Sequence, residues 1–490
     1  MGTLKKLAGQ TAVYGISSIV SRLLNYLLTP YLTRILTPEA YGVNVDMYAL
    51  IPFALVVLTM GMESGYFRFA GKACDEEQKR RVFASTWGAT CAAAALFLAA
   101  ALLLREPIAA AMGYADHSSY IAVVAAIIAL DVATAIPMAR LRERGKALKF
   151  VTVRVLSVVV TVVLSIGFGQ AGLYRTSFGV GYVFVANLVA SGAVLAMVLP
   201  MCQGVRPRVE WRTLKPILLY SMPLLVSGIA GTANEFIDRQ MIKYLTPDSA
   251  ASMAQLGIYG AVVKIAVVMT LFTQMYRMAA EPFFLAGFKK EEFTAANAEA
   301  MKYFIIVSTA IFLGIALFAD LFALIVGSDF REGVFILPVV LGANLLSGVV
   351  LNLSFWYKQT GKTLFAIAVT CTGLLFTVVF NILLVPRMGY LGAAWARLVC
   401  EAAMVAVSWY LNRRYCPTPY DLRRIGGYLL LGALLYAAGT RTASLPPVAH
   451  YACNTLLIFI FCAYAVRRER IDVAGLLRTA TGRLTRRTGR

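Results

Sequence analysis

The chain has 490 residues, of which 59% are hydrophobic and only 14% are charged. Soluble domains are about 45–50% apolar and about 25% charged, so this composition excludes a water-soluble fold. The net charge of +21 would suggest nucleic acid in a soluble protein. Here Lys and Arg lie between apolar runs, where membrane proteins concentrate them, so we expect no nucleic-acid partner.

Apolar runs of about 20 residues, the length needed to cross a bilayer, recur along the whole chain. They predict fourteen transmembrane helices, at 9–33, 44–69, 82–104, 118–139, 150–170, 177–200, 216–243, 255–285, 303–326, 333–356, 364–385, 391–411, 425–440 and 448–466. The first run is too long for a cleavable signal and is interpreted as the first helix. The expected fold class is an all-α polytopic membrane protein.

The basic residues between the predicted helices follow an alternating pattern. With the N-terminus inside, the inner segments hold 32 Lys and Arg and the outer loops hold 7, one of which is Lys243 at the end of the helix predicted at 216–243. Cytoplasmic loops carry such an excess, so we expect both termini in the cytoplasm. The basic tail at 467–490 is expected to contact anionic membrane lipids.

Neither a metal site nor a cofactor is expected from the histidines and cysteines. The chain has two histidines, His117 and His450, both in predicted outer loops, and none of its eight cysteines forms a CxxC pair. No loop is long enough to hold a soluble catalytic domain, so we do not expect an enzyme.

Two segments of the chain resemble each other. RILTPEAYG (34–42) is followed by Asp46 and by MESGYFRF (62–69), and KYLTPDSAASMAQLGIYG (243–260) is followed by Lys264 and by AEPFF (280–284). Counted from the last glycine of each Tyr-Gly pair, Asp46 matches Lys264 and Glu63 matches Glu281. This repeat predicts two pseudo-symmetric six-helix lobes, at 1–212 and 213–412, with two more helices at 413–466 and the tail at 467–490.

Charged residues inside the predicted helices are the candidate functional residues. A charge at the bilayer centre costs at least about 2.5–3.5 kcal/mol, so these side chains are expected to face protein or water. The candidate cationic ligands for an anionic substrate are Arg22, Arg68, Arg239, Lys264, Arg277 and Arg397. The candidate coupling acids are Asp46, Glu63, Glu235, Asp238, Glu281 and Glu401.

Some of these charges have a plain structural interpretation. Arg277 with Glu281, and Arg397 with Glu401, are spaced i to i+4 and are expected to pair along one helix. Spacing also places Glu235 on one helix face with Asp238 and Arg239. Each such group is either a self-neutralised bridge or part of a substrate site, and the sequence leaves both open.

Three stretches resemble a known family. They are GQTAVYGISSIVSRLLNYLLTPYLTRILTPEAYG with MESGYFRFA, then SMPLLVSGIAGTANEFIDRQMIKYL (221–245), then GYLGAAWARLVCEAAM (389–404). They resemble the polysaccharide transporter family of repeat-unit flippases, in the multidrug/oligosaccharidyl-lipid/polysaccharide exporter superfamily. The resemblance implies two six-helix lobes around a cavity.

For function, the resemblance implies a flippase of the bacterial inner membrane for a polyprenyl-pyrophosphate-linked oligosaccharide in polysaccharide or lipopolysaccharide synthesis. It also implies alternating access, basic cavity residues that engage the pyrophosphate, and the polysaccharide polymerase and assembly machinery as partners. A multidrug or cation antiporter of the same fold remains open because of the buried acids. A lipid II flippase also remains open, while a membrane polymerase or glycosyltransferase is disfavoured by the short outer loops.

Overall fold

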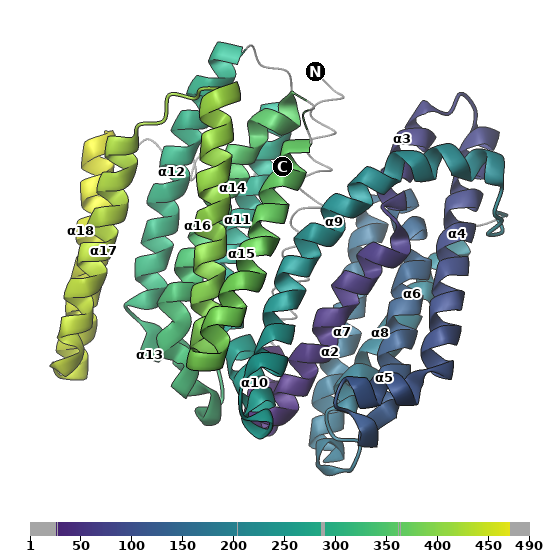
Figure 1. The fold of residues 1–490 in the computed structure, drawn as a ribbon, viewed down its shortest axis with the longest axis horizontal. Coiled ribbons are helices and arrows are strands. Elements are labelled where there is room, and N and C mark those ends of the chain that lie inside the picture. Colours follow the sequence, from purple (N-terminus) through teal and green to yellow (C-terminus); the bar gives the residue numbers. More distant parts are fainter. Residues whose placement is uncertain are drawn as a thin grey trace, which may run out of the picture.

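The computed structural model describes residues 26, 28–202, 204–285, 290–360, 362 and 364–470, which form helices joined by short loops (Figure 1). A helical segment at 28–35 precedes α2. The α-helices that follow are α2 Pro38–Thr59, α3 Met62–Lys72, α4 Glu76–Leu103, α5 Arg105–Ala111, α6 Ser118–Glu143, α7 Ala147–Gln170, α8 Gly181–Val198, α9 Trp211–Leu245, α10 Ser249–Ile265, α11 Val267–Leu285, α12 Lys290–Ala316, α13 Ala319–Ala323, α14 Leu337–Gln359, α15 Leu364–Met388, α16 Tyr390–Tyr415, α17 Leu422–Arg441 and α18 Pro447–Glu469. Short 3-10 helices are η1 Ala115–His117, η2 Leu173–Arg175, η3 Leu199–Cys202, η4 Ser328–Ile336 and η5 Thr442–Ser444.

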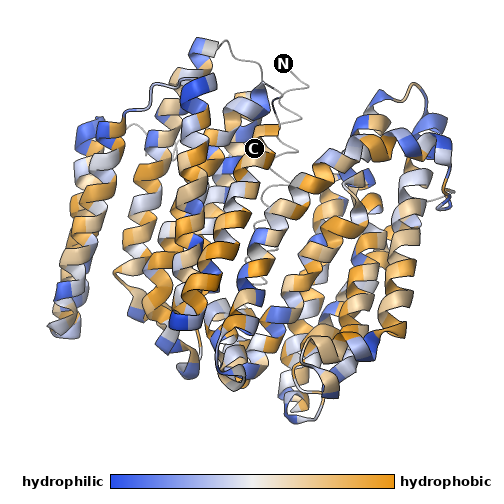
Figure 2. Cartoon of the chain, in the orientation of Figure 1, coloured by the Kyte–Doolittle hydropathy of each residue, from blue (hydrophilic) through white to orange (hydrophobic). Residues whose placement is uncertain are grey.

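The expected all-α polytopic membrane fold is confirmed. Within the described residues, eleven helices are long and apolar enough to cross a membrane, or twelve if α10 and α11 form one bent span. Hydrophobic residues run along the middle of the helices and hydrophilic ones gather at their ends (Figure 2). The count of fourteen is not reached: most of the predicted helix 9–33 lies outside the described residues, and α17 is not among the eleven.

Three predicted helices are each divided in the structure, and one of them is the run 303–326, which becomes the end of α12 and α13. The run 44–69 becomes α2 and α3, because Met60 and Gly61 have φ of 52° and 66° and left-handed residues end a helix. A Cβ at Gly61 would also lie 3.0 Å from the Ser221 carbonyl oxygen. The run 255–285 becomes α10 and α11, which are bent by 50° at their break. Apolar periodicity could not reveal either of the last two breaks.

The helices form two bundles, with α2–α8 in the first bundle and α10–α18 in the second (Figure 1). The bundles meet at one end, where α2 lies beside α10, and diverge toward the other end. We call the meeting end the junction end. The other end carries the turns between α3 and α4 and between α16 and α17, and we call it the basic end after its Lys and Arg residues.

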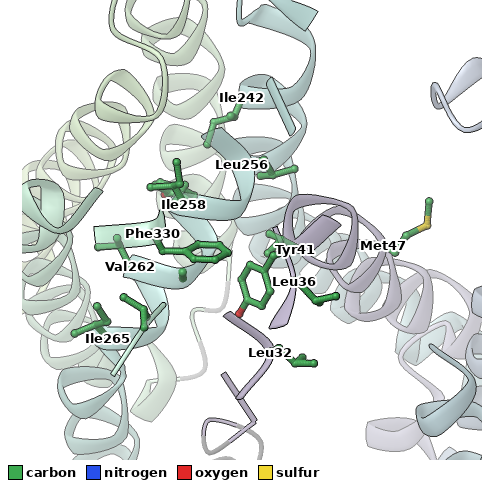
Figure 3. Close-up of a cluster of buried hydrophobic side chains, with 14 of the residues drawn as sticks. Leu32, Leu36, Tyr41, Met47, Ile242, Leu256, Ile258, Val262, Ile265 and Phe330 are labelled. Carbon is green, nitrogen blue, oxygen red and sulfur yellow. The ribbon is translucent and has the colours of Figure 1, made fainter. Parts of the chain in front are cut away.

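The hydrophobic cores follow the same division. The largest core crosses the junction end and includes residues of both bundles. Figure 3 shows part of it, with Tyr41 of α2 beside Phe330 of η4, the two rings lying edge to face with centroids 5.4 Å apart. A second core belongs to the first bundle and the start of α9, and three smaller cores belong to the second bundle. The bundles therefore share a core at the junction end only.

Helix α9 connects the two bundles, and its last turns, which carry Asp238 and Lys243, are counted with the second bundle because they pack on α15 and α10. Its first turns pack on α3 and α4, and its last turns pack on α2, α10 and α15. The close fit at its start depends on Gly65, where a Cβ would come within 2.7 Å of both Ser221 Oγ and Ile217 Cγ2. Pro216 and Pro223 lie inside this 35-residue helix, and such prolines remove backbone hydrogen bonds and favour bending.

The last two helices are fastened to the second bundle at the basic end. Glu469 of α18 has only 2% of its side chain exposed. Its carboxylate accepts hydrogen bonds from Lys302 of α12 at 2.5 Å and from Tyr428 of α17 at 2.8 Å. Arg424 adds a third contact at 3.5 Å, so one carboxylate joins three helices.

Candidate functional site

The two bundles approach most closely where α2 crosses α10. A Cβ at Gly42 would lie 1.9 Å from the Met253 carbonyl oxygen, and one at Gly257 would lie 2.0 Å from the Pro38 carbonyl oxygen. Only glycine fits at these two positions, because any Cβ would meet backbone. Small residues allow membrane helices to pack closely, and here they bring a helix of each bundle into contact.

A buried ion pair joins the bundles beside this crossing. Asp46 of α2 is fully buried, and Lys243 at the end of α9 is 7% exposed. Lys243 Nζ lies 2.5 Å from Asp46 Oδ2. The same carboxylate accepts hydrogen bonds from Tyr114 Oη and Gln240 Nε2, both at 2.6 Å. We call these four residues the latch.

The sequence analysis proposed Asp46 as a coupling acid but placed Lys243 in an outer loop and missed its role. A signal was present in the repeat, because Arg34 and Lys243 stand at the same place before Leu-Thr-Pro. Both side chains reach the other bundle: Arg34 donates to the Leu324 carbonyl oxygen at 3.0 Å, and Lys243 binds Asp46. The repeated corner therefore makes a cross-bundle contact in each half.

Lys264 also lies at the junction end. Its ammonium group donates to the Tyr41 hydroxyl at 2.8 Å and lies 5.2 Å from the centre of that ring. Tyr41 belongs to the first Tyr-Gly pair of the repeat, and Lys264 follows the second. The residue proposed as a substrate ligand thus forms another contact between the bundles.

Glu63 and Glu281, which the repeat matched, make matching ion pairs at the basic end. Glu63 of α3 pairs with Arg142 of α6, and Glu281 of α11 pairs with Lys358 of α14 at 2.7 Å. Glu63 is 45% exposed, so it is not a deeply buried charge. The pair with Lys358 corrects the expected pairing of Glu281 with Arg277, because the neighbouring helix supplies a nearer cation than the next turn does.

A polar cluster lies within the second bundle. Asp238 of α9 is buried and accepts a hydrogen bond from Asn381 of α15 at 3.0 Å. Arg397 of α16 donates to Asn344 of α14 at 3.4 Å, and Glu401, one turn further, is also buried. Arg239, Arg397 and Asp238 all lie within electrostatic range of the buried Tyr259 hydroxyl.

The other proposed residues are dispersed. Arg68 is exposed at the basic end and stacks on Tyr220 of α9, 4.1 Å from the ring centre. Arg277 is exposed on α11. Arg22 lies outside the described residues, as does the side chain of Glu235. The structure thus brings Asp46 and Lys264 to the junction, groups Asp238, Arg239, Arg397 and Glu401, and separates the rest.

Solved structures with the same fold are transporters and flippases. "Lipid II flippase MurJ, inward closed conformation" superposes with a TM-score of 0.75 at 12% identity, covering 94% of this chain and 100% of that one. An inward-facing multidrug resistance MATE family transporter of the MOP superfamily gives a TM-score of 0.69 at 16% identity, covering 80% and 94%. The MATE multidrug transporter DinF-BH gives 0.60 at 16% identity, covering 84% and 95%. At such identities the likeness establishes the fold alone.

The sequence itself establishes the family. No curated protein matches the chain. A family model described as "Polysaccharide biosynthesis protein" matches residues 7–287, which is more than half of the chain and includes both repeated segments and the latch residues. The chain therefore belongs to the polysaccharide biosynthesis protein family, with the fold of the MOP-superfamily transporters.

Proposed function

We propose that the protein is a flippase that moves a polyprenyl-pyrophosphate-linked oligosaccharide across the bacterial inner membrane by alternating access. The observation that carries the proposal is the one-ended junction of the bundles. They share a hydrophobic core and a buried ion pair at the junction end, and they keep separate cores at the basic end. A transporter that rocks two bundles about a central site needs such an asymmetric contact.

The orientation follows from charge. Cytoplasmic loops are rich in Lys and Arg, so we assign the basic end to the cytoplasm and the junction end to the periplasm. Both termini are then cytoplasmic, as the alternating loop charges predict. In this orientation the bundles are closed toward the periplasm, and the latch must separate before cargo leaves on that side.

The substrate class rests on the family and on the basic residues. Arginine binds phosphate through two parallel N–H donors, which suits a pyrophosphate-linked cargo. The candidate ligands are Arg22, Arg68, Arg239, Arg277 and Arg397. We assign Lys264 instead to the periplasmic closure, because it already binds Tyr41 across the junction.

Coupling is proposed to pass through the buried acids Asp46, Asp238 and Glu401. Asp46 is the strongest of the three because its carboxylate joins the two bundles directly. If an ion or proton neutralised the Asp46 carboxylate, the contact with Lys243 would weaken and the periplasmic closure would become less stable. An ion that changes the balance between closed and open states in this way is coupled to the alternating-access cycle.

The test is transport by the full chain in proteoliposomes. The probe is a fluorescent polyprenyl-pyrophosphate oligosaccharide, and its flipping is compared between wild type, Arg277→Ala and Arg239→Ala. Arg105→Ala is the matched control, because Arg105 is exposed at the junction end and pairs only with the neighbouring Glu106 in the described residues. Flipping by wild type and Arg105→Ala, with loss in the other two variants, is the expected result.

Two other cargoes are measured in the same vesicles. Lipid II flipping without oligosaccharide flipping would assign the protein to cell-wall precursor transport. Extrusion of a cationic dye under a proton gradient, with no movement of either lipid, would favour the drug antiporter that the buried acids allow. Either result would overturn the proposed substrate.

A further inference from the structure

A small polar cavity lies inside the first bundle, at the basic end. Its volume is about 270 Å³. Helix α3 contributes one lining residue, the start of α4 three and the end of α6 two, and one more follows α6. These residues are Tyr66, Glu76, Lys79, Arg80, Arg140, Glu143 and Arg144. The cavity therefore lies within one bundle, away from the junction between the two.

The charges around this cavity do not cancel. Four of the lining side chains are cationic and two are carboxylates, so the cavity carries a formal excess of two positive charges. Glu76 lies 3.2 Å from Lys79 and 3.9 Å from Arg144. Glu143 accepts a hydrogen bond from Tyr66 at 3.4 Å and lies 3.9 Å from Lys79. Both acids are thus already engaged with residues other than Arg80 and Arg140.

Arg140 is the residue that points to a ligand. Only 6% of it is exposed, and its guanidinium lies 4.1 Å from the centre of the Phe83 ring. Its Nη1 atom is buried without a hydrogen-bond partner among the described residues. A buried guanidinium nitrogen without a hydrogen-bond partner is costly to the folded state, and an anion that enters the cavity would supply that partner.

The position and lining of the cavity indicate which kind of anion would bind there. The cavity lies where the candidate span Ala115–Glu143 ends, which is the level of lipid head groups at the basic end. Arginine forks and a nearby lysine are the groups that bind phosphate in proteins. Neither histidine lies among the lining residues, so the cavity presents permanent cations.

We propose that this cavity, held by Arg140, Arg80 and Arg144, is a binding site for a phosphate group at the basic face of the membrane. The shared chemistry is a phosphate or pyrophosphate oxyanion, supplied either by an anionic lipid head group or by a soluble phosphate. The site is distinct from the proposed transport route, since its lining comes from the first bundle alone. It does not depend on which cargo the protein moves.

The test uses the full chain in nanodiscs and measures thermal unfolding. One arm adds inorganic phosphate or pyrophosphate to nanodiscs of phosphatidylcholine. The other arm compares these with nanodiscs that contain phosphatidylglycerol. The variants are Arg80→Ala, which changes an exposed lining residue, and Arg140→Met, which removes the buried charge while filling its space. Arg81→Ala is the matched control, because Arg81 is exposed, pairs with Glu77 and does not line the cavity.

We expect stabilisation of the wild type and of Arg81→Ala in one of the two arms. Arg80→Ala should weaken the apparent affinity about tenfold, as loss of a charged hydrogen bond does, and Arg140→Met should abolish it. Arg140→Met should also unfold at a higher temperature than the wild type without ligand, because it removes a buried uncompensated charge. A response to soluble phosphate in the neutral discs identifies an aqueous anion, and a response to phosphatidylglycerol alone identifies a lipid.

Two results would overturn the site. One is the absence of any stabilisation of the wild type in both arms. The other is an equal loss in Arg81→Ala and Arg80→Ala, which would mean that the response follows net surface charge and not this cavity. Because Arg80 is exposed, its substitution leaves packing intact, so a loss of binding in that variant cannot be attributed to misfolding.

Discussion

Replacing Lys243 with methionine should open the junction end. Methionine has a similar volume, so the substitution removes the charge without creating a cavity. It leaves the fully buried Asp46 carboxylate with Tyr114 and Gln240 but without its cation. Removing one partner of a buried ion pair costs about 3–5 kcal/mol. The cost falls on the closed junction, because separation of the bundles gives Asp46 access to water.

The size of the expected shift follows from that cost. At about 1.4 kcal/mol for each factor of ten, the ratio of closed to open junction should fall roughly a hundredfold to several thousandfold. A double variant, Lys243→Met with Asp46→Asn, removes both charges, and replacing a whole buried pair is often nearly neutral. The double variant should therefore have a ratio of closed to open junction near that of the wild type, although both charges of the latch are missing.

The assay is the distance between spin labels across the junction end. Labels at Thr176, after η2, and at Asp329, in η4, lie on exposed positions of the two bundles. They are introduced in a background without the eight native cysteines. Lys358→Met is the control, because its pair with Glu281 has the same chemistry but is about one-third exposed and stays within the second bundle.

We expect a longer, broader distance distribution for Lys243→Met and wild-type distributions for the control and the double variant. The reasoning is refuted if Lys243→Met keeps the wild-type distance. It is also refuted if the double variant opens as far as the single one, since an unpaired buried charge would then not be the cause.

Two further predictions concern packing and docking. Gly42→Ala should reduce transport and lower the melting temperature, because its methyl group would lie 1.9 Å from the Met253 carbonyl oxygen, whereas Gly71→Ala, with nothing within 4 Å, should change neither. If Gly42→Ala kept the transport rate and melting temperature of the wild type, α2 and α10 would not pack as described. Glu469→Ala should destabilise the protein by about 3–5 kcal/mol, because Lys302 loses its buried partner, and Glu106→Ala, at an exposed pair, should cost less than about 1 kcal/mol. Equal thermal unfolding of these two variants would contradict the docking of α18 through Glu469.

Most of the helical architecture could be predicted from the sequence, because apolar runs of about 20 residues usually form membrane-spanning helices. The break at Met60 and Gly61 could not, since the left-handed conformation of a methionine leaves no compositional trace. The bend between α10 and α11 was hidden in the same way, because apolar residues continue through it.

The candidate site was predicted less completely, and the reason is spatial. Pairing rules along one helix linked Glu281 to Arg277, but the structure pairs it with Lys358, a residue of α14. Lys243 was counted as a single loop charge, and its partner Asp46 lies 197 residues away in the sequence. The internal repeat predicted more than the i to i+4 spacing did. It matched Glu63 with Glu281, and the structure gives each of these acids an ion pair with a neighbouring helix.

The route of α9 has a consequence for how the protein is made. The first bundle's own core includes Leu214 and Ile217, which lie in the first turns of α9. A ribosome that has synthesised only the helices through α8 has not yet supplied these side chains, so the first half inserts with an unfinished core. Fragments split between Gly204 and Glu210 should therefore assemble only when they are co-expressed.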